Sequence, residues 1–209
     1  LIVKRDYWPT SIWQIANPNE LGLEESVLSR LHPIIQSEYG NTSGIVIIKN
    51  GYIVHESYYN SYGPDDTLHV ASVTKSVLSA LIGIAVDQGY ITSIENSVLD
   101  YFPEYPLDSS DSKKHQIRIK HLLTMTAPYS YEMEPFQELC LSPDWAKFAL
   151  ELLDGAGKIG EFKYSTAGAH LLSAIITRST GKCAREFANE YLFGPIGARI
   201  LPDYEMTAS

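Results

Sequence analysis

A β-hairpin signal near the N-terminus is the feature that most restricts the fold of this chain. Two runs rich in β-branched and aromatic residues, 44–49 and 52–58, are joined at Asn50-Gly51. This dipeptide is typical of the turn that matches the twist of antiparallel strands. The first run is apolar on both faces, which predicts an inner strand of a sheet covered by helices. Two strands cannot form such a sheet alone, so we expect further strands to complete it.

The rest of the sequence follows the helical period. Residues 23–39 repeat apolar side chains at helical spacing, and Pro33 is expected to kink or interrupt this helix. Beyond the hairpin, caps and glycine stops predict further helices. They span residues 72–88, 118–125, 145–153 (with Ser142-Pro143 as cap and first turn), 166–179 and 184–193.

Charge and composition restrict the partners of the chain. Its 209 residues are 44% hydrophobic and 20% charged, as in ordinary globular proteins. A net charge of −9 without a Lys/Arg cluster argues against nucleic acid or an anionic membrane as partner. No apolar run is long enough to predict a membrane segment. Cys140 and Cys183 are too few for a disulfide scaffold and do not identify the redox compartment. The chain starts at Leu1 without a visible signal peptide, so the sequence predicts no cellular compartment.

A serine and a lysine one turn apart begin the longest apolar helix. Ser72 and Lys75 stand at positions i and i+3, which are neighbours on a helix surface. A serine hydroxyl needs a nearby proton acceptor to act as a nucleophile, and an amine serves when burial or positive charge lowers its pKa. The helix start also offers unpaired N–H groups. We interpret Ser72 as nucleophile and Lys75 as base; the alternative is a helix N-cap followed by a solvated lysine.

The Ser-x-x-Lys spacing is weak evidence alone, because it occurs three times. Ser110 and Lys113 lie in a polar loop that cannot desolvate a lysine. Ser179 and Lys182 straddle Gly181, which is expected to end a helix. Only the first pair therefore meets the chemical requirements.

Other motifs point to no cofactor or metal. Residues 155–160 match the Gly-x-Gly-x-x-Gly fingerprint but follow a predicted helix instead of a strand, so we interpret them as a connecting loop. No Gly-x-Ser-x-Gly elbow occurs. The six histidines lack metal-ligand spacing, and we predict neither a metal site nor a cofactor. His121 and His170 are interpreted as hydrogen-bonded structural residues.

Tyr164 directly precedes the helix predicted at 166–179. A phenol beside a cationic lysine has a lowered pKa and can take or return a proton during acyl transfer. Taken alone, Tyr164 is interpreted as a core or surface tyrosine.

Three motifs in this order resemble the serine β-lactamase and penicillin-binding-protein superfamily, and most closely its class C β-lactamase and esterase-like branch. The resemblance covers about residues 8–198, and three ordered motifs are more specific than any one. They are Ser72-Val73-Thr74-Lys75, residues 119–126 (IKHLLTMT) and residues 162–176 (FKYSTAGAHLLSAII).

This resemblance implies an α+β, β-lactamase/DD-peptidase-like fold, in which an antiparallel sheet is flanked by helices and a helical subdomain. We therefore predict one partial domain over residues 1–209, with the N-terminal helix and hairpin in 1–70 and the helical region in 71–198. The resemblance also implies an acyl-enzyme. Ser72 would attack a carbonyl carbon, and its backbone N–H would be one donor of the oxyanion hole. Lys75 would take the proton of Ser72, and Tyr164 would protonate the leaving group.

The chain departs from the family pattern twice. Thr166 stands where the family has asparagine, and a hydroxyl has fewer donors and a shorter reach. We predict that Thr166 binds substrate, and that an esterase, amidase or peptidase-like activity fits as well as antibiotic hydrolysis. The family's third motif, a lysine or histidine followed by a small residue and glycine, has no counterpart before Ser209. We therefore expect an N-terminal fragment without the C-terminal strands. Without one oxyanion-hole donor, the transition state loses about 2.7 to 4 kcal/mol of stabilisation.

These inferences lead to three functional hypotheses. The first is a cofactor-free serine hydrolase that is acylated at Ser72 by a small-molecule or peptide-like amide, ester or β-lactam. The second is a catalytically silent, ligand-binding or sensor-like member, and the third is a helical scaffold in which Ser72 and Lys75 are incidental. An unpaired hairpin edge also predicts a homo-oligomer or swapped pairing between chains.

Overall fold

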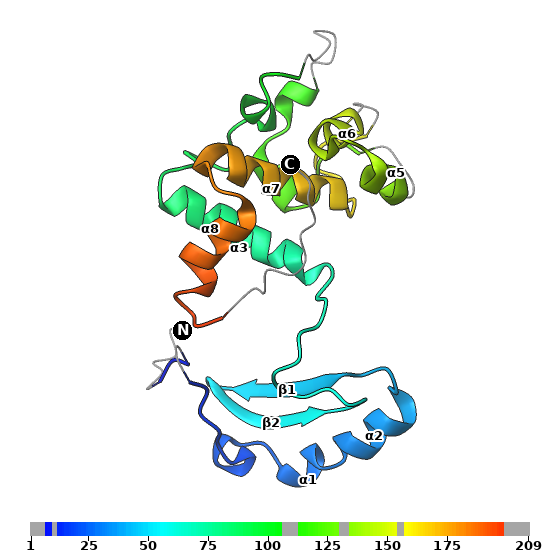
Figure 1. Cartoon of the computed structure of the whole chain (residues 1–209), viewed down its shortest axis with the longest axis vertical. Helices are drawn as coiled ribbons and strands as arrows, with labels where there is room; N and C mark the ends of the chain where they lie inside the picture. Colours follow the sequence, from blue (N-terminus) through cyan, green and yellow to red (C-terminus); the bar gives the residue numbers. More distant parts are fainter. Residues whose placement is uncertain (1–6, 10–11, 106–112, 130–133, 154–156, 199–209) are drawn as a thin grey trace. The chain divides into compact units, whose positions relative to one another are not determined.

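The structure of the chain is a computed structural model that describes residues 7–9, 12–105, 113–129, 134–153 and 157–198. The chain divides into two compact units, residues 1–69 and 70–209. Figure 1 shows the strands in the first unit and the long helices in the second. This division lies next to the boundary predicted between the hairpin region and the helical region. That both regions form one domain stays a prediction.

The N-terminal unit contains the predicted hairpin. Strand β1 (Gly44–Lys49) pairs antiparallel with β2 (Tyr52–Tyr58). Asn50 and Gly51 have φ values of 53° and 90°, as a two-residue turn of this hand requires. The hairpin prediction is therefore confirmed. Two features were not predicted: a bulge between Ile47 and Ile48, and a parallel bridge from Ile15 to Ile53 that adds the N-terminal segment to the sheet.

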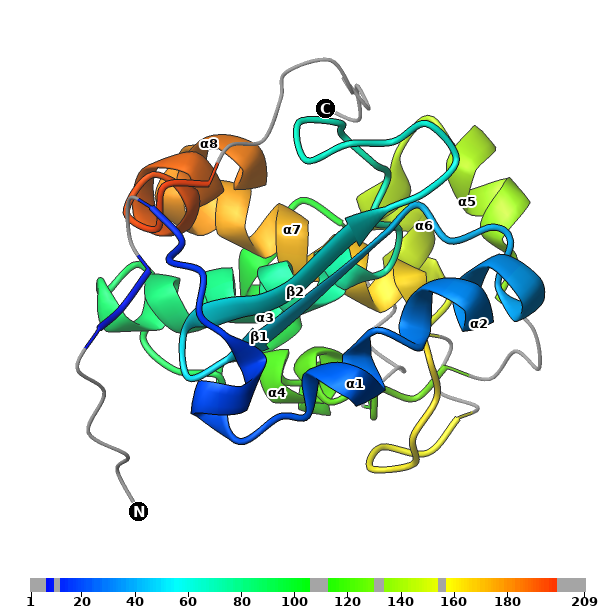
Figure 2. The same ribbon diagram turned by 90° about the horizontal axis from the view of Figure 1, so that it is seen from below.

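Two short helices run one after the other along the hairpin (Figure 2). They are α1 (Glu25–Leu28) and α2 (Leu31–Glu38), preceded by a 3₁₀ turn at Pro18–Leu21. The single helix predicted over 23–39 is broken, but not by Pro33, which is the third residue of α2. The first turn of a helix tolerates proline because its N–H would have no partner there.

One face of the hairpin is left uncovered by the elements of its own unit. His32 of α2 stacks on Tyr59, with ring centroids 5.5 Å apart, on the covered side. Val46 and Ile48 of β1 are 47% and 48% exposed, whereas Ile45 and Ile47, which alternate with them, are partly buried. Within the N-terminal unit this face has no cover, and the expectation that helices cover the whole sheet stays a prediction for it.

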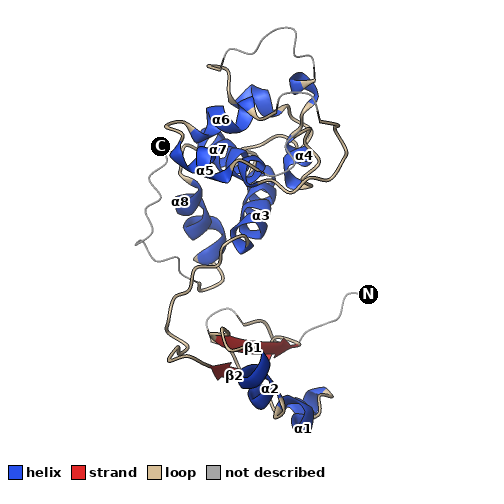
Figure 3. Ribbon diagram, turned by 90° about the vertical axis from the view of Figure 1, so that its right-hand side faces the viewer, coloured by secondary structure: helices blue, strands red, loops and turns tan. Residues whose placement is uncertain are grey.

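In the C-terminal unit, the described residues form helices joined by loops (Figure 3), with one isolated bridge between Ser97 and Arg118. Its two longest helices, α3 (Val73–Asp87) and α7 (Thr166–Thr180), pack against each other, and α4 and α6 also pack on α7. Helix α7 is therefore the centre of this core. The other elements are the 3₁₀ turns η2 (Val98–Tyr101) and η3 (Lys114–Gln116), α4 (Ile119–Leu123), α5 (Phe136–Leu141), α6 (Trp145–Glu151), α8 (Ala184–Ala188) and the π-helical turn η4 (Asn189–Phe193).

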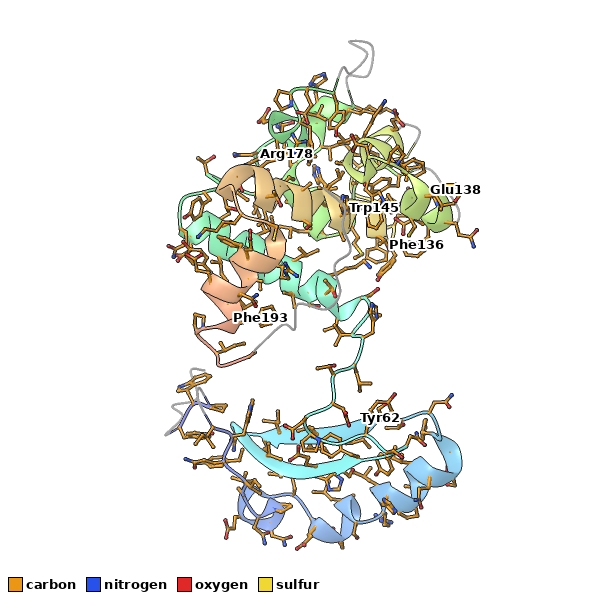
Figure 4. All side chains as sticks on the ribbon, in the orientation of Figure 1. Tyr62, Phe136, Glu138, Trp145, Arg178 and Phe193 are labelled. Carbon is orange, nitrogen blue, oxygen red and sulfur yellow. The ribbon has the colours of Figure 1, made fainter. Side chains whose placement is uncertain are left out.

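Several helix ends follow the sequence signals and others do not. Gly181 ends α7 with a φ of 72°, as predicted for a glycine stop. Helix α6, in contrast, is capped by Asp144, which accepts a 2.8 Å bond from the N–H of Lys147, instead of by Ser142-Pro143. Arg178, labelled in Figure 4, ties α7 to η2 through the carbonyl of Tyr101 at 2.9 Å.

We expect Phe187→Ala to destabilise the chain by about 3 to 5 kcal/mol, because truncating a buried aromatic ring leaves a cavity. Phe187 is fully buried, and its ring lies 4.6 Å from that of Tyr191 and 5.9 Å from that of Tyr90. Phe162→Ala is the control, since that ring is 68% exposed and its loss should cost within about 0.5 kcal/mol. Urea unfolding measures both, and equal midpoints would contradict the assigned core.

Candidate active site

The side chains of Ser72 and Lys75 are in contact at the start of α3. Nζ of Lys75 donates a 3.0 Å hydrogen bond to Oγ of Ser72. Ser72 occupies the N-cap position, but its side chain makes no capping bond to the helix backbone. The alternative of a capping serine followed by a solvated lysine is therefore wrong for this side chain.

The backbone immediately before Ser72 is strained. Ala71 has a φ of 45°, in the left-handed region, and Ser72 follows with φ −70° and ψ −3°. A left-handed conformation costs an L-residue roughly 1–2 kcal/mol, least for a small side chain. The N–H groups of Val73 and Thr74 donate to the carbonyls of Val70 and Ala71 at 3.1 and 3.2 Å. These bonds close a tight turn that presents Ser72 at the helix start, and strain of this kind clusters at functional sites.

Tyr164 completes a group of three polar side chains. Hydrogen bonding to Ser72, and next to Lys75, lowers the pKa of the Tyr164 hydroxyl. Nζ of Lys75 also lies 4.9 Å from the centroid of the tyrosine ring. Because Tyr164 is 48% exposed, solvent reaches the ring in this structure. The structure thus brings together three of the four predicted site residues.

The loop before Tyr164 is held by the second motif. The N–H of Gly160 donates to the carbonyl of Thr126 at 2.9 Å, and the N–H of Lys163 donates to the carbonyl of Met125 at 2.8 Å. Gly157 packs so closely that an added Cβ would lie 2.5 Å from the carbonyl carbon of Pro128. The described part of the 155–160 pattern is therefore a connecting loop, as predicted, and Gly157 is needed for close backbone approach. Residues 155 and 156 lie outside the described residues.

Thr166 is bonded to a residue that the sequence did not single out. Its N–H donates to Oε2 of Glu134 at 2.8 Å, and hydrogen bonding by its side chain also lowers the pKa of that carboxyl. Glu134 lies between the second and third motifs in sequence, and no spacing signal marks it. Only the folded chain places it at the start of α7.

The other Ser-x-x-Lys pairs are not joined in this way. The hydroxyl of Ser179 donates to the carbonyl of Ile175 at 2.8 Å, while Lys182 forms an ion pair with Glu190. Ser110 lies outside the described residues. Of the pairs that the structure describes, Ser72 and Lys75 alone share a hydrogen bond.

The two histidines have structural surroundings. Nδ1 of His121 accepts a 3.0 Å bond from the N–H of Arg118 at the start of α4, as expected for a structural residue. The ring of His170 packs edge-on against Trp145 at 5.2 Å, and burial lowers the pKa of His170. Within the described ranges, no group of three or more His, Cys, Asp or Glu side chains could hold a metal ion. The same residues contain no helix with the length and apolar character needed to cross a bilayer.

Comparison with known proteins shows the family of the chain. Residues 38–199 match the Beta-lactamase family, and because the match covers most of the chain, the protein belongs to that family. A curated relative, the 6-aminohexanoate-dimer hydrolase of Paenarthrobacter ureafaciens, is 25% identical over 173 residues, which make up 75% of this chain and 43% of the relative. The chain therefore spans less than half of that protein.

Solved structures show the same fold. A putative β-lactamase from Bacteroides dorei has a TM-score of 0.63 at 21% identity, covering 85% of this chain and 54% of its own. FmtA from Staphylococcus aureus has a TM-score of 0.62 at 16% identity, covering 88% and 51%. EstCE1, described as a hydrolase with promiscuous acyltransferase activity, has a TM-score of 0.62 at 21% identity, covering 84% and 52%. The predicted α+β, β-lactamase-like fold is confirmed, and the chain spans about half the length of these proteins.

Proposed function

We propose that the protein is a serine hydrolase of the β-lactamase and penicillin-binding-protein type, which forms an acyl-enzyme at Ser72. Hydrolase function is supported by the family match and by the hydrolase relatives. The observation that carries the choice of nucleophile is the 3.0 Å contact between Lys75 Nζ and Ser72 Oγ, beside the ring of Tyr164, whose centroid lies 4.9 Å from Lys75 Nζ.

In the proposed reaction, Oγ of Ser72 attacks the carbonyl carbon of an amide, ester or β-lactam. Its proton passes to the pair formed by Lys75 and Tyr164, either of which accepts it in its deprotonated form. The same pair returns the proton to the leaving nitrogen or oxygen as the carbonyl–heteroatom bond breaks. Water then attacks the ester at Ser72 and releases the acid. The N–H of Ser72 is the proposed oxyanion donor in both steps.

Thr166 is proposed to bind substrate as a hydrogen-bond acceptor. Hydrogen bonding by the Thr166 side chain lowers the pKa of Glu134, and a hydroxyl that donates to the carboxylate keeps lone pairs that can accept a bond from the substrate. Such an oxygen suits an N–H of a peptide-like substrate better than a carbonyl. The relative named for 6-aminohexanoate dimers makes a small amide a reasonable first substrate to assay.

A fluorophosphonate probe tests the proposal directly. The serine oxygen would bond to phosphorus and displace fluoride, leaving an adduct that intact mass spectrometry detects. We expect one adduct per chain, which peptide mapping places at Ser72. An adduct at another residue, or none with probe in excess, would contradict the proposal.

Binding without turnover is the second candidate. It is favoured because the third family motif does not occur in these 209 residues, which leaves one proposed oxyanion donor within them. Saturable binding of a β-lactam, seen by calorimetry without a mass adduct, would support this candidate over the hydrolase.

Self-association through the hairpin edge also stays a prediction. In the described residues, β1 pairs only with β2, so its outer edge offers free backbone donors and acceptors. We expect light scattering to report a species larger than one chain. A stable, dispersed monomer at high concentration would count against it.

A further inference from the structure

The carboxylate of Glu134 lies against the start of α7 although it comes from the segment before α5. Oε2 accepts the N–H of Thr166 at 2.8 Å, and Oε1 accepts the N–H of Ala167 at 2.7 Å. Oε1 also accepts a 3.1 Å bond from the hydroxyl of Ser165. Glu134 is partly buried, so these bonds are shielded from water.

Together with Ser165, this carboxylate accepts hydrogen bonds from the N–H groups at the start of α7. Ser165 is the N-cap residue, 3% exposed, and its Oγ accepts the N–H of Gly168 at 2.8 Å. The first three N–H groups of α7 therefore all have an acceptor within the protein, where a helix otherwise leaves them open. A negative charge at this position also complements the positive end of the helix dipole.

The charge state of Glu134 agrees with this role. Burial acts to raise the pKa of Glu134, but the hydrogen bonds from Ala167 and Thr166 outweigh it and hold the pKa below its ordinary value. The group is thus an anion at neutral pH and presents two acceptor oxygens. A neutral amide of the same shape would present only one.

We propose that Glu134 is a positioning residue for the reaction at Ser72: by clamping residues 165–167 it holds Tyr164 within hydrogen-bonding reach of Ser72 and Lys75. This inference rests on the proposed function. Tyr164 directly precedes the clamped residues, so few backbone torsions separate its ring from the clamp. Errors of about 1 Å in such a group cost roughly 100-fold in rate.

The matched test is Glu134→Gln beside Asp144→Asn. Both replace a carboxylate that caps a helix by its amide, but Asp144 caps α6. We expect Glu134→Gln to lower the maximal rate of labelling by the fluorophosphonate probe about 10- to 100-fold, with little change in the half-saturating probe concentration. Asp144→Asn should stay within about twofold of the wild type, because it does not touch the clamp. Wild-type labelling in Glu134→Gln, or equal slowing in both variants, would overturn the proposal.

A titration of Tyr164 tests the clamp without relying on acylation. The negative charge of Glu134 raises the pKa of Tyr164, while the hydrogen bonds from Ser72 and Lys75 lower it. If Glu134 acted by charge alone, Glu134→Gln would lower this pKa. Loss of positioning would raise it instead, because both hydrogen bonds would be lost.

The ultraviolet difference between each background and its Tyr164→Phe partner isolates this phenol from the other tyrosines. We expect an upward pKa shift in Glu134→Gln, and an unchanged or lowered value would overturn the proposal. Failure of the wild-type chain to label would reject the proposed function. The titration would still show whether Glu134 positions Tyr164.

Discussion

Replacing Ser72 by alanine is expected to abolish labelling by a fluorophosphonate or a β-lactam, because the only atom removed is the oxygen that attacks. Ser76 lies one turn further along α3 and is exposed, so Ser76→Ala is the matched control and should label at the wild-type rate. Intact mass spectrometry over a time course measures both variants. An adduct that persists in Ser72→Ala, or that disappears in Ser76→Ala, would show that another group reacts.

The same variant separates a nucleophile from a helix cap. A serine that caps a helix contributes about 0.5–2 kcal/mol, which is lost in the alanine variant. Ser72 makes no capping bond, and its Oγ instead accepts a hydrogen bond from Nζ of Lys75. We therefore expect the unfolding free energy of Ser72→Ala to stay within about 0.5 kcal/mol of the wild type. A loss of about 1 kcal/mol or more in urea unfolding would favour the structural role.

Lys75→Met is expected to slow acylation on the order of 10³-fold, which is the range for removing a general base. Methionine keeps the length and apolar stem of lysine but has no group that takes a proton. Lys147→Met is the control, since Lys147 lies on α6 and pairs at 3.8 Å with Glu151 on the same exposed surface. Stopped-flow or quenched labelling gives both rates, and a Lys75→Met rate within tenfold of the control would exclude lysine as the base.

Lys75→Met also has a consequence for Tyr164. Lys75 contributes a hydrogen bond and a positive charge that lower the pKa of this phenol, second only to the hydrogen bond from Ser72. Removing both effects should raise the pKa of Tyr164. Ultraviolet titration against Tyr164→Phe measures the shift, and a pKa that stays constant would mean that the two side chains do not interact in solution.

Local signals predicted the parts of the fold whose hydrogen bonds join residues only a few positions apart in the sequence. The turn at Asn50-Gly51 needs two positive φ values, and this dipeptide supplies them at little cost. Gly181 ends α7 for the same backbone reason. The pairing of Ser72 with Lys75 follows from helix geometry once α3 begins where its apolar pattern begins.

Other features were missed because their partners are distant in sequence. Helix α5 (Phe136–Leu141) has no strong cap signal, and its one buried side chain, Leu139, becomes buried only by packing in the core. The bridge between Ile15 and Ile53 joins two segments that no short-range pattern connects. Asp144 caps α6 in place of the predicted Ser142-Pro143, and its carboxylate also accepts a 2.6 Å bond from Tyr105, which is distant in sequence.

By itself, the sequence determined the hairpin, the start of α3 and the contact of Ser72 with Lys75, since each depends on backbone geometry within one turn. Tertiary structure alone decided that the loop before α7 would dock on residues 125–128 and bring Tyr164 to that pair. It also decided that Glu134 would close the start of α7. The reason is physical: these contacts join segments far apart in the chain, and they form only when core packing compensates the entropy lost in bringing those segments together.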